Sequence, residues 1–126
     1  MADPRLRDWL RDAPLRSDTR VAIVGFPSDE GVRRNGGRPG AADGPLAIRE
    51  ALHRMTPDAR DPGPFSALLD QTADLGDIDV TGDLEADQAL LAERVGDLRT
   101  RGIVPIVLGG GHETAYGHFL GYVATE

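Results

Sequence analysis

The chain has 126 residues, of which 40% are hydrophobic and 28% charged, and its formal net charge is −7. This suits one soluble globular domain, while the acidic balance argues against a nucleic-acid partner and the absence of cysteine excludes disulfides and thiolate chemistry. No apolar run approaches the roughly 18 to 20 residues of a membrane span and the N-terminal segment has no signal-peptide core, so we expect a cytoplasmic protein.

We expect a short helix and then a strand in the first 26 residues. Residues 5–11 have the spacing of a short amphipathic helix, with Trp9 as a packing anchor. Residues 21–26 (VAIVGF) form the first clear strand. Their continuous apolar character is typical of a strand that helices cover on both faces.

A glycine-rich loop follows at residues 28–44 (SDEGVRRNGGRPGAADG), and it is longer than most connections. In an open α/β sheet it would lie over the carboxyl end of the preceding strand, where ligands bind. Arginine can bind a carboxylate through two parallel hydrogen bonds, and asparagine can donate or accept. The candidate substrate-binding residues are Arg33, Arg34, Asn35 and Arg38. The alternative is a plain flexible surface loop.

The dipeptide at residues 44–45 (GP) predicts the start of a helix, because proline is favourable at the first helical position. Its apolar stripe consists of Leu46, Ile48, Leu52 and Met55. We place His53 on the helix surface. Residues 57–66 are interpreted as a proline-rich connection, and a short strand is expected at residues 72–75 with a turn at Gly76. Four aspartates, at positions 70, 74, 77 and 79, lack the order of a calcium-binding loop and are interpreted as turn and cap residues.

The clearest helix spans residues 83–100, with acidic residues early and basic residues late, and Gly102 is its stop signal. Residues 103–108 (IVPIVL) predict a buried strand. Pro105 cannot donate to a ladder, so this strand either lies at an edge or begins pairing after the proline. Strands that alternate with helices predict an α/β fold with a parallel sheet and crossover helices.

The sequence GGGHE at residues 109–113 would turn sharply off the carboxyl end of the last strand and present His112 there. Three chemistries compete. Phosphate binding lacks a complete glycine-loop motif, and a Thr114 nucleophile with His112 lacks a recognisable orienting group. Metal ligation by the imidazole of His112 is the third, with Glu113 as an acceptor that fixes its orientation. His118 could join only through a favourable helix geometry. A buried, hydrogen-bonded His112 without chemistry is the alternative.

Three stretches together resemble the ureohydrolase family, which comprises arginases, agmatinases and formimidoylglutamases. They are GVRRNGGRPGAADGPLAIR (31–49), DLGDID (74–79) and PIVLGGGHETAYGH (105–118). The NGGRPGAADGP stretch, and GGGHE in place of a GGDHS-like motif, point to the formimidoylglutamase branch. The resemblance runs from about residue 21 to residue 122.

The resemblance implies an arginase-like, three-layer α/β/α fold with a parallel sheet and a binuclear manganese centre at the carboxyl ends of its strands. His112 matches the first metal-ligand histidine of the family. A hydroxide that bridges the two Mn²⁺ ions would attack the amidine carbon of a small-molecule substrate. For this branch, N-formimidoyl-L-glutamate and water give L-glutamate and formamide, a step of histidine degradation.

The chain lacks the D-A-H-x-D and S-x-D-x-D-x-x-D-P segments that supply the other metal ligands in the family. We therefore expect residues 1–126 to be a single N-terminal portion of such a domain. This portion would be inactive alone and need not contain bound manganese. The alternatives are an agmatinase or guanidino-acid hydrolase, and a non-catalytic α/β binding or assembly module. We expect a homo-oligomer, since an exposed sheet edge offers unpaired backbone groups to a partner.

Overall fold

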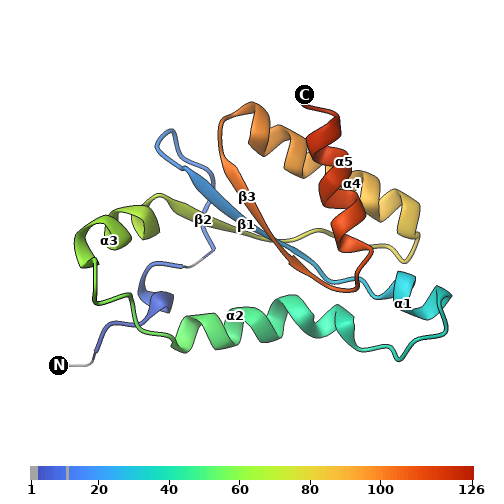
Figure 1. The fold of residues 1–126 in the computed structure, drawn as a ribbon, viewed down its shortest axis with the longest axis horizontal. Coiled ribbons are helices and arrows are strands. Elements are labelled where there is room, and N and C mark those ends of the chain that lie inside the picture. Colours follow the sequence, from blue (N-terminus) through green and yellow to red (C-terminus); the bar gives the residue numbers. More distant parts are fainter. Residues whose placement is uncertain (1–2, 11) are drawn as a thin grey trace.

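Three parallel strands form the centre of the computed structural model, which describes residues 3–10 and 12–126 (Figure 1). They are β1 (Val21–Phe26), β2 (Thr72–Asp77) and β3 (Val104–Gly109), in the spatial order β2-β1-β3. The helical elements are η1 (Leu6–Asp8), α1 (Glu30–Arg34), η2 (Ala41–Asp43), α2 (Gly44–Arg54), α3 (Pro62–Asp70), α4 (Leu84–Thr100) and α5 (Thr114–Val123). The predicted parallel sheet with crossover helices is confirmed.

Helices cover both faces of the sheet. Successive side chains of β1 point to opposite faces, so each face has an apolar core of its own. On one face the core consists of Ala22, Val24 and Phe26 with Ile78, Leu91, Val95, Leu98 and Ile103. On the other face Ile23 packs with Leu6, Leu10 and Leu69. Figure 1 shows α4 and α5 on one side of the sheet and α2 on the other. This is the three-layer α/β/α arrangement that the resemblance implies.

The last strand is less buried than its sequence predicts. Pro105 is buried and paired with Ala22 in the ladder, but Val104 and Ile106 are 57% and 45% exposed. Within the described residues β3 pairs only with β1 and therefore lies at an edge. This agrees with the edge position proposed for a strand that contains proline. The expectation of a buried strand is wrong at positions 104 and 106, where the described residues leave the side chains exposed.

The second helix, α2, begins at Gly44 with proline at its first turn, as predicted. Its apolar stripe is buried only in part. Leu52 packs against the second core cluster, whereas Leu46, Ile48 and Met55 are exposed. The amphipathic pattern therefore identified a helix but not a face that the described residues cover.

On another side of α2, Arg49 anchors the helix to β2. Its guanidinium donates to Asp74 through Nε at 2.8 Å and Nη2 at 3.0 Å, and Nη1 also bonds Asp77. Gly25 makes room for this cluster, since a Cβ there would collide with the Asp77 carboxylate. Asp74 and Asp77 therefore pair with Arg49. Among the described residues no group of three or more His, Cys, Asp or Glu side chains is placed to hold a metal.

Two elements differ from the sequence predictions for local reasons. The proline-rich stretch assigned as a connection contains most of α3, because Pro62 occupies the first helical position and Phe65 and Leu69 pack into the second core cluster. The strand expected at 72–75 continues to Asp77, and the predicted turn residue Gly76 lies inside it with φ +75°.

The helix in the N-terminal segment is shorter than predicted. Only η1, a single 3₁₀ turn, forms there, and Arg11 of the predicted helix lies outside the described residues. Trp9 packs against the second core cluster, so its predicted anchor role is confirmed. No helix in the described part of the chain is long and apolar enough to cross a membrane.

Candidate metal and substrate site

The glycine turn leaves β3 and passes close under the loop that follows β1. Gly110 has φ +75°, a conformation that favours glycine. A Cβ at this position would lie 2.8 Å from the Ser28 carbonyl oxygen and would collide with that of Phe26. Only glycine fits there, and the turn places His112 two residues before the start of α5.

His112 is exposed at a cavity of about 390 Å³ on the surface beside β3. The lining residues are Val107, Gly109, Gly110, Gly111, His112, Thr114, Ala115 and His118. Among the described residues, His112 is therefore exposed rather than buried. An imidazole that faces open space is free to ligate a metal ion.

The structure brings His118 to the same cavity. Its Nε2 is buried and has no hydrogen-bond partner among the described residues, its ring is tilted against Tyr122 with centroids 5.2 Å apart, and burial lowers the pKa of its imidazole. Burial favours the neutral ring. The Thr114 hydroxyl is also buried and has no partner in the described part of the chain, so it does not form a nucleophile–base pair with His112.

Three hydrogen bonds fix the turn to other elements. The Gly111 N–H donates to the Ser28 carbonyl at 2.9 Å, and Gln88 Nε2 of α4 donates to the Glu113 carbonyl at 3.0 Å. The third runs from the Gly31 N–H of α1 to Glu113 Oε1 at 3.1 Å. The turn is thus held by β1's following loop, by α4 and by α1.

Sequence reasoning missed Gln88. It is 7% exposed on the inner face of α4, three residues before the fully buried Leu91. A polar side chain at a buried helical position needs a hydrogen-bond partner, and this is the signal that identifies it. Glu113 was predicted to orient His112, whereas its carboxylate accepts the Gly31 N–H.

The loop at 28–44 is more ordered than a plain loop, because it contains α1 and η2. Asp29 closes it. This carboxylate, with a side chain only 9% exposed, accepts from the Gly40 N–H at 2.8 Å and from Arg33 Nε at 3.1 Å. The Gly40 N–H and the Arg33 guanidinium together lower the pKa of Asp29.

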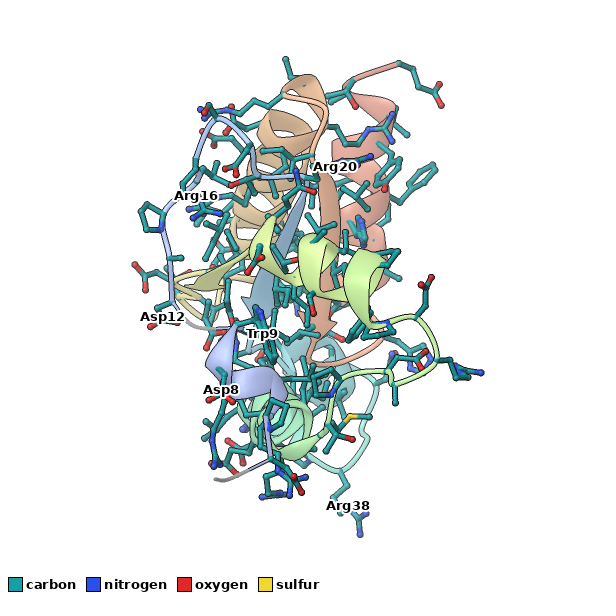
Figure 2. All side chains as sticks on the ribbon, turned by 90° about the vertical axis from the view of Figure 1, so that its left-hand side faces the viewer. Asp8, Trp9, Asp12, Arg16, Arg20 and Arg38 are labelled. Carbon is teal, nitrogen blue, oxygen red and sulfur yellow. The ribbon has the colours of Figure 1, made fainter. Side chains whose placement is uncertain are left out.

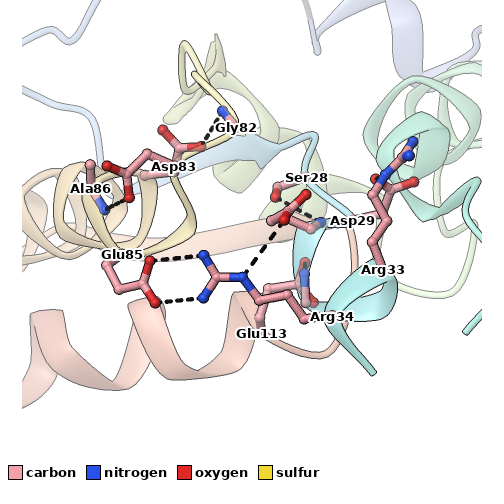
Figure 3. Close-up of polar contacts among 12 residues, drawn as sticks. Ser28, Asp29, Arg33, Arg34, Gly82, Asp83, Glu85, Ala86 and Glu113 are labelled. Atoms are coloured by element: carbon pink, nitrogen blue, oxygen red, sulfur yellow. Dashed lines mark hydrogen bonds and ion pairs between the residues drawn. The ribbon is translucent and has the colours of Figure 1, made fainter. Parts of the chain in front are cut away.

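The four predicted binding residues divide into two pairs. Arg33 is held by Asp29, and Arg34 donates two hydrogen bonds, at 2.6 and 3.1 Å, to the Glu85 carboxylate of α4 (Figure 3). The Arg34 guanidinium lowers the pKa of Glu85 from 4.5 to about 2.

The second pair lies at the exposed tip of the loop. Asn35 follows the last residue of α1. Its backbone N–H donates to the Gly31 carbonyl, and its side chain is exposed. Arg38 extends away from the rest of the chain (Figure 2) and forms no ion pair with any described residue. Of the three arginines, Arg38 is the one that has no acidic partner among the described residues.

The sequence model of the Arginase family matches residues 19–125. The chain is 49% identical over 126 residues to a formimidoylglutamase of Chromobacterium violaceum, covering 99% of this chain and 38% of that protein. It is 47% identical over 112 residues to a formimidoylglutamase of Klebsiella pneumoniae, covering 88% of this chain and 33% of that protein.

Among solved structures, Trypanosoma cruzi formiminoglutamase with Mn²⁺ superposes with a TM-score of 0.82 at 33% identity, covering 98% of this chain and 41% of that one. The Bacillus subtilis formimidoylglutamase gives a TM-score of 0.83 at 21% identity, with coverage of 98% and 38%, and so shows the fold alone. The chain spans between 33% and 41% of the length of these four relatives.

Proposed function

The chain belongs to the arginase family, and from this premise we propose that a full-length protein in which residues 1–126 form the N-terminal part hydrolyses N-formimidoyl-L-glutamate to L-glutamate and formamide. The observation that carries this proposal is the 49% identity to a formimidoylglutamase over the whole chain. The exposed His112 at the carboxyl end of β3 supports it, because this end of a parallel sheet is where ligands bind.

For the metal, we propose that His112 supplies one nitrogen ligand to manganese. A free imidazole is a suitable donor for a divalent transition metal, and the Trypanosoma cruzi formiminoglutamase structure contains Mn²⁺. When bound, manganese activates water for attack on an amidine carbon. The described residues provide no group of three or more potential ligands, so the remaining donors of a two-manganese site would come from outside residues 1–126.

For the substrate, we propose that the loop at 28–44 recognises its carboxylates. Arg38 is the best candidate for a direct contact, because its guanidinium has no acidic partner among the described residues. Asn35 lies three residues before it and has an exposed side chain. Arg33 and Arg34 already pair with Asp29 and Glu85, so we assign them to the shape of the pocket unless they exchange partners on binding.

Two properties of the whole protein follow from the same proposal. Residues 1–126 alone would lack hydrolase activity, because one imidazole cannot hold two metal ions. The full-length protein would be a cytoplasmic homo-oligomer, as we expect from the sequence. The exposed apolar side chains of β3 and α2 support a surface that further protein covers.

A substrate panel tests the proposal. The full-length protein loaded with Mn²⁺ is assayed with N-formimidoyl-L-glutamate, agmatine and guanidino acids at equal concentrations. We expect N-formimidoyl-L-glutamate to have the highest kcat/KM, with formamide and L-glutamate as products. A preference for agmatine or for a guanidino acid would replace this function with the alternative hydrolase. A protein that forms a stable oligomer without Mn²⁺ and turns over none of the three would support the assembly module.

A further inference from the structure

One side chain connects the turn that carries His112 to the loop that carries Arg38. Glu113 Oε1 accepts a hydrogen bond from the Gly31 N–H at 3.1 Å. Gly31 is the second residue of α1, so its N–H has no carbonyl partner within that helix. Asp29, the residue before α1, makes no side-chain cap bond. Glu113 therefore satisfies a donor that α1 itself leaves open.

The space around this bond is shaped for a carboxylate. A Cβ at Gly31 would lie 2.8 Å from both Cδ and Oε2 of Glu113. A Cβ at Gly111 would collide with the same carboxylate from the other side. Glycine at these two positions lets the Glu113 side chain lie between the turn and α1.

Behind this bond, the loop is connected by its own hydrogen bonds. Asp29 joins its two ends through Arg33 and the Gly40 N–H, and Gly37 N–H bonds the Val32 carbonyl at 2.9 Å. A displacement of Gly31 is therefore carried to the tip that bears Arg38. Gln88 differs from Glu113 in this respect, since its side chain bonds the turn from α4 and has no hydrogen bond to the described residues of the loop.

We propose that Glu113 is a positioning residue that acts on the substrate loop rather than on His112. Its bond to Gly31 sets where the arginine loop lies relative to the metal-ligand turn, and hence where the substrate carboxylate is held relative to the metal. This inference rests on the proposed function for the roles of His112 and Arg38. The contact itself does not depend on that function.

Amide exchange of the 126-residue chain tests the contact without any activity. We expect Glu113→Ala to speed exchange of the Gly31 N–H by about tenfold, the usual effect of losing a hydrogen bond to a charged acceptor. Glu113→Gln keeps an acceptor oxygen and should retain most of the protection. Gln88→Ala is the matched control, because it loosens the turn but leaves the Gly31 bond. Unchanged exchange at Gly31 in Glu113→Ala would overturn the proposal.

Kinetics of the full-length protein then separate the two possible roles of Glu113. We expect Glu113→Ala to raise KM about tenfold, with kcat and the affinity for Mn²⁺ little changed, and Glu113→Gln to restore KM. A loss of kcat and Mn²⁺ affinity at unchanged KM would mean that Glu113 acts on His112, and the proposal would be wrong. If the wild-type protein releases no formamide, the proposed function fails while the exchange experiment still decides the contact.

A substitution on the loop side makes the same test from the other partner. Gly31→Ala places a methyl group against the Glu113 carboxylate and should raise KM as Glu113→Ala does. Gly63→Ala is the matched control, because a Cβ at this helical glycine of α3 meets open space. The proposal is contradicted if Gly31→Ala leaves KM at the wild-type value, or if Gly63→Ala raises it equally.

Discussion

The turn at 109–114 and the loop tip at 35–39 follow neighbouring strands, yet they are held very differently. The turn is bonded to Ser28 and Gly31 in the loop after β1 and to Gln88 on α4. Among the described residues, the hydrogen bonds of the tip stay within its own loop, and its side chains are exposed. Polar backbone groups in the buried part of the turn need partners within the protein, whereas water can hydrogen-bond the exposed tip. The difference matches the two proposed tasks, since a metal ligand requires a fixed position and a carboxylate-binding arginine requires an exposed guanidinium.

The turn should be the more fragile of the two regions. Gly110→Ala adds a Cβ that collides with the Phe26 carbonyl and forces a positive φ on alanine. We expect it to destabilise the folded chain by about 3 kcal/mol or more, the range of substitutions that combine strain and overpacking. Urea unfolding measures the free energy of unfolding. Gly63→Ala is the control and should leave that free energy unchanged or slightly increase it. Wild-type stability in Gly110→Ala would contradict the described geometry.

The ligand on the turn should matter for activity but not for folding. His112→Ala in the full-length protein should lower formamide release by about 100-fold or more, because loss of a direct ligand should cost at least as much as loss of a residue that supports one. The melting temperature of the metal-free protein should not change, since His112 is exposed. Activity assays and thermal unfolding are compared on the same preparation. Full activity in His112→Ala would remove His112 from the site.

The tip should affect binding alone. Arg38→Ala should raise KM about tenfold, the order of magnitude for a charge-assisted hydrogen bond, with kcat and stability close to wild type because Arg38 is exposed. Arg7→Ala, an exposed arginine on η1, is the control. Unchanged kinetics in Arg38→Ala would mean that the tip does not touch the substrate.

The smallest effect is expected where the loop meets α4. Folding lowers the pKa of Glu85 to about 2 from 4.5, so its pairing with Arg34 stabilises the loop above pH 4.5 and is lost as the pH falls towards 2. The protection of the α1 amides, taken as exchange relative to the intrinsic rate at each pH, should therefore decrease over this interval, more in the wild type than in Glu85→Gln. The effect on global stability should be slight, because exposed ion pairs contribute little. Equal pH dependence in the two proteins would show that the pair does not hold the loop.

Local patterns in the sequence were sufficient for β1, α4 and the glycine turn, because each is a continuous signal within one element. They failed for α3, where proline was interpreted as a breaker although it occupies the first helical turn. They also failed for the exposed side chains of β3 and α2, since periodicity shows which residues share a face but not what covers it.

The contacts of the site could not be predicted for a different reason. The bond from Gly31 to Glu113 joins residues 82 positions apart, and the bond from Gln88 to Glu113 joins residues 25 apart. Nothing local to Glu113 distinguishes an acceptor for His112 from an acceptor for α1. Three arginines in one loop likewise look equivalent until Asp29 and Glu85 engage two of them.

The central claim is that residues 1–126 contribute one corner of a manganese site, presented by the turn at His112. Formamide release from N-formimidoyl-L-glutamate, measured in parallel for the full-length protein and for residues 1–126 across a Mn²⁺ titration, tests it most directly. We predict Mn²⁺-dependent release by the full-length protein and none by the shorter chain. Mn²⁺-dependent release by residues 1–126 alone, or activity of the full-length protein that does not depend on metal, would contradict the account.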